Sequence, residues 1–296
     1  MRVFFIGTVE FSRKMLETLI EIPEAEVVGV ATKSVSSFNS DHSDLSDIAK
    51  QKGIPFKYTK NINDVETLQW IKSLEPDVIY CFGWSSLIKK DLLELTKLGV
   101  IGYHPAKLPN NRGRHPLIWA LVLGLSETAS TFFKMDEGAD SGEILSQVSF
   151  DIQPEDNAQS LYEKMISIAR LQVKEFTPQL ASNAFELIEQ NHKKSNYWRK
   201  RGKKDGEIDF RMTSEAIYNL VRGLTKPYAG AHIVNGSSAF KVWKTAIGPE
   251  APNNLEPGKV LDIKNNGEVL VKTSNGTIWL VDHELEQLPE IKGYIQ

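Results

Sequence analysis

The chain has few of the features that mark secreted and membrane proteins. Its single cysteine, Cys81, excludes an internal disulfide and points to a reducing compartment. It has no run of about eighteen apolar residues, so no membrane-spanning helix is expected. The N-terminus enters a strand-like run at Val3 without the charged and apolar blocks of a signal peptide. These absences predict a cytoplasmic protein without a membrane partner.

Positive charge and glycine are also scarce where some functions would need them. The net charge is −3 at neutral pH, so no overall positive field attracts nucleic acid. After the first strand-like run, Phe5 to Glu10 holds only Gly7, whereas the pyrophosphate loop of dinucleotide-binding proteins uses three glycines. This argues against a nicotinamide-dependent dehydrogenase. We also expect no metal centre.

Apolar runs and helical spacing alternate over the first two thirds of the chain. Alternation of strands and helices indicates a parallel sheet, so we predict an α/β, Rossmann-like domain over residues 1–190. Its expected strands include Arg2–Ile6, Ala25–Ala31 and Asp77–Phe82, and its expected helices include Phe11–Ile22, Val65–Leu74, Pro116–Leu123 and Asn157–Gln179.

The last third of the chain has a different pattern. Residues 193–204 hold seven Lys and Arg and no acidic residue, and we predict a basic linker over 191–204. A helix is expected at Ser214–Leu224. The turns Asn265-Asn266-Gly267 and Ser274-Asn275-Gly276 lie between Val-rich segments and predict hairpins. We therefore predict a small, mainly β, OB-like domain over 205–296.

Two polar residues lie where strand-like runs end. His104 follows the run Leu98–Tyr103, and Asp140 lies in a glycine-punctuated turn after Ala129–Met135. Open α/β sheets place their chemistry at the carboxyl ends of strands, and a histidine oriented by a carboxylate can act as a general base. On these residues alone, a core histidine and a turn aspartate remain the alternative.

The sequence around this pair resembles the formyltransferases that use N10-formyltetrahydrofolate. The matching motifs are His-Pro-x-x-Leu-Pro-x-x-Arg-Gly from His104 and Met-Asp-Glu-Gly-x-Asp-x-Gly from Met135. Phe4–Thr8 is similar to the family's first strand and turn, and Asp205–Phe210 and Arg222–Ala231 to the start of its C-terminal domain. The resemblance implies an N-formyltransferase with formyltetrahydrofolate as donor, in which His104 is the base and Asp140 orients it.

The resemblance also implies a donor-binding site made of three segments. One segment lines the pterin pocket, one lies beside the reduced ring, and one forms the opposite wall with its backbone groups. These residues are Phe82, Gly83, Trp84, Leu87 and Ile88; Lys107, Leu108 and Pro109; and Met135, Glu137, Gly138, Ala139 and Asp140. For Trp84, simple packing in the core is the alternative.

The chain departs from the family at Gly102. The family usually has Asn two residues before the histidine, and that side chain donates a hydrogen bond to the oxyanion; losing such a donor costs on the order of 3 kcal/mol. We expect His115 to act as a substitute, with a helix-cap or packing role as the alternative. Asn110 and Asn111 are weaker candidates, because they also fit an ordinary turn.

Initiator methionyl-tRNA, an amino sugar and water are the acceptors to be compared. The tRNA enzymes carry a basic insertion after the second strand, whereas residues 32–47 here hold Asp41, Asp44 and Asp47 and one basic residue, Lys33. Residues 205–296 carry nine Lys and Arg against twelve Asp and Glu. Hydrolases of the family usually carry an N-terminal regulatory domain, for which we see no room before the first strand.

We therefore predict N-formylation of an amino sugar that is linked to a nucleotide. Asp41–Leu45 resembles sugar N-formyltransferases, and Arg112–Pro116 is similar to those of bacterial nonulosonic acid pathways. Thr8, Arg112, Arg222 and Tyr228 are the expected acceptor-binding residues. A methionyl-tRNA formyltransferase and a non-catalytic folate or nucleotide-sugar binder remain alternatives. We expect a small-molecule substrate and no nucleic-acid partner, and a homodimer is one alternative for the oligomeric state.

Overall fold

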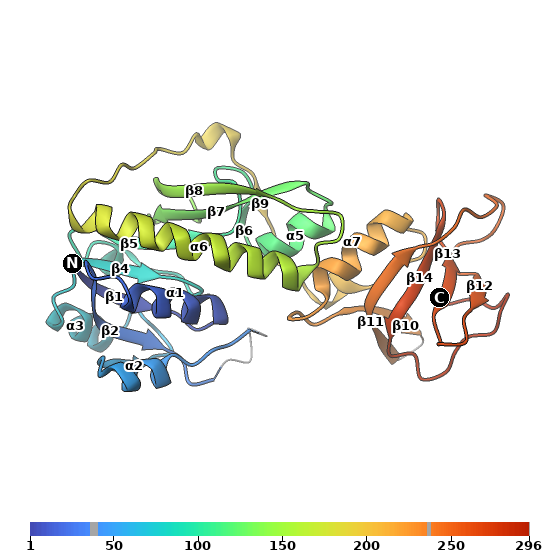
Figure 1. The fold of residues 1–296 in the computed structure, drawn as a ribbon, viewed down its shortest axis with the longest axis horizontal. Helices are drawn as coiled ribbons and strands as arrows, with labels where there is room; N and C mark the ends of the chain where they lie inside the picture. Colours follow the sequence, from blue (N-terminus) through green and yellow to red (C-terminus); the bar gives the residue numbers. More distant parts are fainter. Residues whose placement is uncertain (36–40, 236–237, 296) are drawn as a thin grey trace. The chain divides into compact units, whose positions relative to one another are not determined.

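The computed structural model describes residues 1–35, 41–235 and 238–295 (Figure 1). These residues group into two compact units. The first comprises 1–116, 128–150 and 163–198, and the second comprises 117–127, 151–162 and 199–296. Because the chain passes between the units more than once, neither unit is one continuous segment.

The first unit is built on a seven-stranded sheet in the order β3-β2-β1-β4-β5-β7-β8. The four adjacent pairs from β3 to β5 in this order are parallel, which confirms the predicted α/β class, whereas β7 pairs antiparallel with β5. An apolar run carries no information on strand direction, so the sequence could not predict this reversal. The bounds are β1 Arg2–Ile6, β2 Glu26–Thr32, β3 Phe56–Tyr58, β4 Val78–Cys81, β5 Val100–His104, β7 Glu127–Lys134 and β8 Ile144–Asp151.

The central strands are buried on both faces. On one face, Phe176 of α6 lies between Tyr80 and Phe132, at ring-centroid distances of 5.8 and 4.9 Å. On the other face, Phe4 and Ile79 pack in a cluster that includes residues of α3. The helices in or entering this unit are α1 Glu10–Ile20, α2 Ser46–Lys52, α3 Val65–Ser73, α4 Lys90–Leu93 and α6 Ala158–Ala181.

The second unit contains a five-stranded antiparallel sheet in the order β10-β11-β14-β13-β12. The predicted Asn-Gly turns connect β12 to β13 and β13 to β14, as expected. Helix α7, Ser214–Leu224, packs Ile217 and Val221 into the core of this unit, together with Ile118 of α5, Pro116–Val122. The strands are β10 Ala231–Asn235, β11 Ser238–Ile247, β12 Val260–Ile263, β13 Val269–Lys272 and β14 Thr277–His283.

The basic segment that we expected to be a linker carries regular structure. Strand β9, Tyr197–Trp198, pairs in parallel with β6, Arg112–Gly113. Further on, the Trp119 indole donates to the Arg199 carbonyl at 3.0 Å, and the Arg201 guanidinium lies 4.5 Å from the Trp119 ring centroid. The positive charges of this segment are therefore partly engaged in local packing.

Two further expectations concern Cys81 and membrane crossing. Cys81 is buried in β4, and this burial raises the pKa of its thiol to about 12, so it is not a nucleophile at neutral pH. Within residues 1–35, 41–235 and 238–295, no helix has both the length and the apolar character needed to cross a membrane.

Candidate active site

The structure brings His104 and Asp140 together at the carboxyl edge of β5. His104 is the last residue of β5 and is 4% exposed, and Asp140 lies in the loop that follows β7. Their closest atoms, His104 Nδ1 and Asp140 Oδ2, are 3.6 Å apart. The two predicted residues therefore form a histidine–carboxylate pair at the position where parallel sheets place ligands.

The second nitrogen of His104 fixes how the ring is used. His104 Nε2 lies 2.7 Å from the carbonyl oxygen of Asn111. Since a carbonyl can only accept, Nε2 must carry a hydrogen. A ring protonated on both nitrogens donates to the Asn111 carbonyl, and its charge lies near the Asp140 carboxylate, at a distance too long for a hydrogen bond. The arrangement thus stabilises the conjugate acid that a general base becomes after taking a proton.

Asp140 accepts hydrogen bonds from one backbone amide and from one side-chain amide. The Gly113 amide donates to Asp140 Oδ2 at 2.9 Å, and the Gln190 side-chain amide donates to the Asp140 carbonyl at 3.0 Å. Asp140 has φ of 53°, and Asn111 and His115 have φ of 63° and 57°. Non-glycine residues adopt this left-handed region at a cost, and they often do so at functional sites.

The structure gives a physical reason for glycine at position 102. Gly102 lies two residues before His104 on the same strand and so faces the same side of the sheet. A Cβ added there would lie 2.7 Å from Met135 Cγ and 3.1 Å from Phe133 Cζ. Asparagine therefore cannot be accommodated unless Met135 moves. Whether His115, which is half-buried directly before α5, replaces the missing donor stays a prediction.

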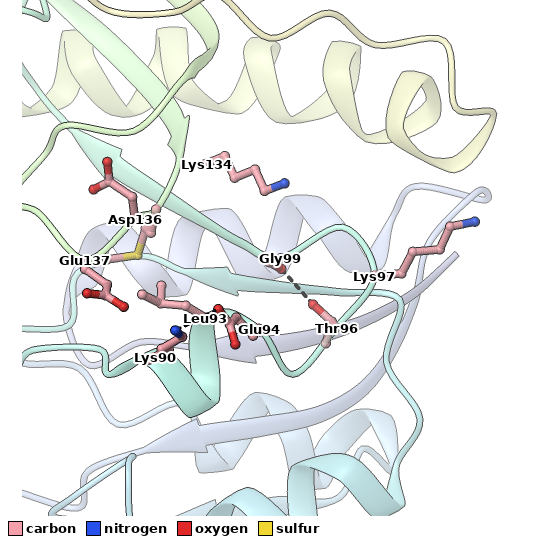
Figure 2. A pocket seen from close by; sticks show the side chains of 10 residues that line it. Lys90, Leu93, Glu94, Thr96, Lys97, Gly99, Lys134, Asp136 and Glu137 are labelled. Carbon is pink, nitrogen blue, oxygen red and sulfur yellow. Dashed lines mark hydrogen bonds and ion pairs between the residues drawn. The ribbon is translucent and has the colours of Figure 1, made fainter.

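A cavity of about 450 Å³ lies beside Met135 (Figure 2). This volume is within the range of small-ligand sites. Met135 and Leu93 supply apolar surface, and Glu94, Asp136 and Glu137 supply hydrogen-bond acceptors. A flat heteroaromatic ring with amino and N–H donors, such as a pterin, fits this combination. The remaining lining residues are Lys90, Thr96, Lys97, Gly99 and Lys134.

The other predicted donor-binding residues are divided between core and surface. Phe82 is fully buried, and its ring packs on Phe5, Tyr80 and Phe132, so its side chain belongs to the core. Ile88 is also buried, whereas Leu87 is 70% exposed. Leu108 packs with Phe133 and precedes Pro109 through a cis peptide bond. Lys107, Gly138 and Ala139 are exposed.

Thr8 lies where the strand order reverses, between β1 and β4. Its hydroxyl donates to the Gly83 carbonyl at 3.0 Å, and its carbonyl lies 2.9 Å from His42 Nδ1. Trp84 follows Gly83, and the Lys33 ammonium lies 4.4 Å from the Trp84 ring centroid. Within the described part of the chain, the buried atoms His42 Nε2 and Trp84 Nε1 have no hydrogen-bond partner. In open α/β sheets in general, ligands commonly bind at the point where the strand order reverses.

Three residues expected to bind the acceptor have contacts within the protein. Arg112 is 1% exposed, so a direct contact with an acceptor does not fit its position. In the second unit, Arg222 Nη1 donates to the carbonyls of Gln153 and Asp156, at 3.1 and 2.9 Å, which fixes the turn before α6. Tyr228 packs against the core of the second unit. An acceptor-binding role for Arg222 and Tyr228 stays a prediction.

Sequence reasoning missed Gln190 and the backbone carbonyl of Asn111. Gln190 lies 50 residues after Asp140, outside every motif that we identified, yet its side chain reaches the Asp140 loop. Asn111 was considered for its side chain, whereas its carbonyl makes the contact to His104. No sequence pattern signals either contact.

Comparison with known proteins matches both parts of the chain. Residues 1–172 match the Formyl transferase family model, and residues 200–294 match the model of the Formyl transferase C-terminal domain. The chain is 33% identical to the bifunctional polymyxin resistance protein ArnA of Wigglesworthia glossinidia brevipalpis over 248 residues. That match covers 81% of this chain but 38% of ArnA.

Two solved structures share the fold along nearly the whole chain. One is WlaRD, described as a sugar 3N-formyl transferase in the presence of dTDP and 5-N-formyl-THF, with a TM-score of 0.71, 19% identity and coverage of 97% of this chain and 99% of WlaRD. The other is an N-formyltransferase from Helicobacter canadensis in complex with folinic acid and dTDP-3-aminofucose. Its TM-score is 0.68 at 19% identity, with 94% of this chain and 98% of that chain covered.

Both residues of the histidine–carboxylate pair lie within the stretch that matches the Formyl transferase family model. The formyl donor of such enzymes is N10-formyltetrahydrofolate. The chain belongs to the formyl transferase family.

Proposed function

We propose that this enzyme formylates the amine of a nucleotide-linked amino sugar. The observation that carries the proposal is the His104–Asp140 pair at the carboxyl end of β5. In the reaction, the amine nitrogen bonds to the formyl carbon, the bond from that carbon to N10 of the folate breaks, and one proton passes from the amine to N10. The chain must therefore move a proton and stabilise the charge that develops.

His104 is the proposed base, and Asp140 stabilises the imidazolium that results. In its basic form His104 presents a bare Nε2, which an oxygen lone pair of the Asn111 carbonyl would repel. The acceptor amine must then take the place of that carbonyl beside Nε2. After the proton transfer, Nδ1–H faces Asp140 Oδ2, and Nε2–H passes its proton to N10 of the leaving folate, which returns His104 to its basic form.

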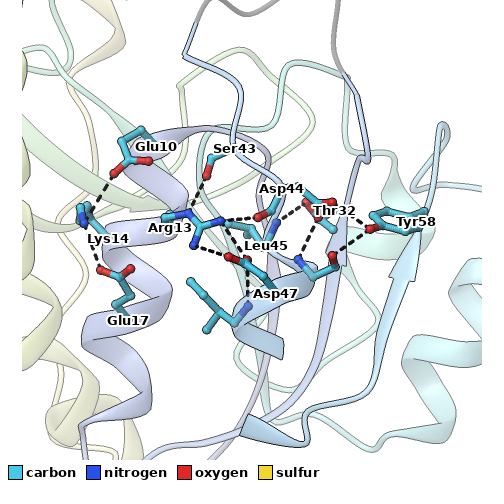
Figure 3. A network of polar contacts seen from close by, with 12 residues as sticks. Glu10, Arg13, Lys14, Glu17, Thr32, Ser43, Asp44, Leu45, Asp47 and Tyr58 are labelled. Carbon is cyan, nitrogen blue, oxygen red and sulfur yellow. Dashed lines mark hydrogen bonds and ion pairs between the residues drawn. The ribbon is translucent and has the colours of Figure 1, made fainter. Parts of the chain in front are cut away.

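The segment that follows β2 supports a small acceptor rather than tRNA (Figure 3). Arg13 donates to Ser43 Oγ at 2.7 Å and to Asp47 Oδ1 at 2.9 Å, and the Tyr58 hydroxyl donates to Asp44 Oδ2 at 2.8 Å. These bonds fix acidic side chains in the position where tRNA enzymes of the family carry basic ones. Because phosphate contacts dominate nucleic-acid affinity, this face disfavours tRNA.

His42 in the same segment has a buried ring nitrogen, Nε2, without a hydrogen-bond partner in the described part of the chain. Its Nδ1 faces the Thr8 carbonyl and so carries the hydrogen, which leaves Nε2 of the neutral ring as an acceptor. Trp84 Nε1 adds a donor nearby along the Thr8–Gly83 connection. Both solved relatives bear dTDP or a dTDP-sugar, which agrees with an acceptor of this class.

Product analysis tests the proposal. The enzyme is incubated with N10-formyltetrahydrofolate and a panel of dTDP- and UDP-linked amino sugars that includes dTDP-3-aminofucose. The masses of the products are then determined by mass spectrometry. We expect one class of sugar to gain a formyl group, and the same reaction with His104→Ala to give almost none. Absence of formylation on every sugar would contradict the proposal.

Methionyl-tRNA is the alternative acceptor, and the basic segment 193–204 is the feature that favours it. The structure engages part of that charge, since Arg199 Nη1 donates to Asp205 Oδ2 at 2.9 Å and Arg201 lies over Trp119. We therefore expect no tight complex with initiator methionyl-tRNA. A salt-sensitive, submicromolar complex in a filter-binding assay would favour the tRNA acceptor instead.

A further inference from the structure

The Gln190 side chain donates to two backbone carbonyls of the loop that contains Asp140. Its side-chain Nε2 donates to the Asp140 carbonyl at 3.0 Å and to the Gly142 carbonyl at 2.6 Å. An amide nitrogen has two hydrogens, so both donors of Gln190 are used on this loop. Gln190 is 4% exposed, so water cannot easily replace these bonds.

Arg112 holds the other end of the Gln190 side chain. Arg112 Nε and Nη2 donate to Gln190 Oε1 at 3.2 and 2.6 Å, so this one oxygen accepts two hydrogen bonds from the same guanidinium. The same guanidinium donates to the Tyr197 hydroxyl at 3.0 Å and lies 3.1 Å from His192 Nδ1. All of these acceptors are neutral, so a charged side chain is buried to hold a neutral amide in one orientation.

Asp140 accepts one of these hydrogen bonds on its backbone and another on its side chain. Gln190 fixes the Asp140 backbone, and Gly113, the residue after Arg112, donates its amide to Asp140 Oδ2 at 2.9 Å. Arg112 and Gly113 form β6, which pairs with Tyr197 and Trp198 of β9. Asp140 itself has a left-handed backbone that needs such support. We name Gln190 and Arg112, with these contacts, the Gln190 brace.

We propose that Gln190 is a positioning residue, which acts on the reaction by fixing the Asp140 carboxylate beside His104. The inference rests on the proposed roles of His104 and Asp140. It also accounts for Arg112, which is too buried to touch an acceptor but is joined to the loop that holds the catalytic carboxylate.

Gln190→Glu is the sharpest test, because it keeps the side-chain size and the oxygen that faces Arg112. The lost amide nitrogen becomes an oxygen that faces the carbonyls of Asp140 and Gly142. Gln172→Glu is the matched control, since Gln172 is 2% exposed and its Nε2 donates to the Ser130 carbonyl at 3.1 Å and to Ser146 Oγ at 2.8 Å, away from the Asp140 loop. Gln190→Met, which removes both kinds of bond, serves if the Glu variant does not fold.

We expect Gln190→Glu to lower kcat by on the order of 10- to 100-fold, as for a small misplacement of a catalytic group, with KM for folate and sugar nearly unchanged. Gln172→Glu should lower Tm at least as much, because Gln172 Oε1 has no hydrogen-bond partner in the described part of the chain and the new charge would be buried unpaired, and it should leave kcat close to that of the wild type. In an Asp140→Ala background, Gln190→Glu should have no further effect on kcat, because the group it positions is gone. Equal kcat losses in the two glutamate variants, or a full additional loss in the Asp140→Ala background, would overturn the inference.

A second measurement needs no acceptor. The ¹⁵N resonances of the His104 ring report its hydrogen bonds and tautomer at fixed pH. They should differ from the wild type in Gln190→Glu and match it in Gln172→Glu. Unchanged His104 resonances in Gln190→Glu would refute the brace. Wild-type enzyme that formylates no amino sugar would instead contradict the proposed function, so the two failures are separate.

Discussion

Two segments at the carboxyl edge of the seven-stranded sheet are held in opposite ways. The Asp140 loop is fixed by hydrogen bonds from the buried Gln190 side chain and from the Gly113 amide. The segment 41–47 after β2 is fixed by Arg13, whose partner Asp47 has a side chain that is 64% exposed. Water competes with the second kind of contact far more than with the first. Where a carboxylate must keep its place beside a base, the chain uses buried bonds.

This difference predicts that changes at the Asp140 loop reduce activity far more than changes at 41–47. His104→Ala and Asp140→Ala should each lower kcat by about 10³-fold, because general-base catalysis contributes this order of rate. Turnover and Tm are measured together on each variant. Near wild-type turnover in a folded His104→Ala would show that His104 is not the base.

His115 tests whether the active-site loop also supplies the oxyanion donor. His115→Ala should lower kcat by on the order of 10²-fold, with a smaller rise in KM, because a contact made in the transition state is lost. His115→Asn, which can still donate, is the matched variant and should recover part of kcat. An unchanged kcat in His115→Ala would assign the role to a backbone group or to Asn110.

Gly102 and Met135 test how tightly the active-site side is packed. Gly102→Asn should destabilise the protein by about 2 kcal/mol, as overpacking does, because its Cβ would meet Met135 Cγ at 2.7 Å. Met135→Ala in the same chain should restore much of Tm by making room for the new side chain. Chemical denaturation of the single and double variants gives the coupling energy, and purely additive losses would contradict the shared space.

Removing the Asp47 carboxylate from segment 41–47 should reduce the stability of the protein only slightly, and only above acidic pH. The hydrogen bond from Arg13 lowers the pKa of Asp47, so this carboxylate stabilises the fold above its unfolded pKa of about 3.9, and the stabilisation fades as pH falls through the lower, folded value. Asp47→Asn should cost about 0.5 kcal/mol near neutral pH and nothing below both pKa values. Denaturation at pH 7 and pH 2 measures this, with kcat expected to stay constant; a large loss of kcat would erase the contrast between the two segments.

The sequence predicted the elements better than it predicted the contacts between distant segments. Helix α7 has the predicted bounds Ser214–Leu224, because its apolar spacing and the Thr213 cap are local signals. Strand β8, Ile144–Asp151, was missed because its outer residues are half exposed and polar. His104 and Asp140 were found through motifs that resemble a family. The contact of Gln190 with the Asp140 loop and the contact between Met135 and Gly102 join segments that are distant in the sequence. Only the folded chain brings these segments together, so local patterns could not reveal the contacts.

The short β6–β9 pairing has a consequence for exchanging modules between relatives. The last strand that supports the catalytic loop, Tyr197–Trp198, lies beyond residue 172, where the match to the N-terminal family model ends, and beyond the end of α6. A chimera joined at the end of α6 would give the catalytic half a foreign Gln190, Tyr197 and Trp198. A junction placed after Trp198 keeps Gln190, Tyr197 and Trp198 with the loop that they support. The junction between exchangeable modules therefore lies inside the basic segment.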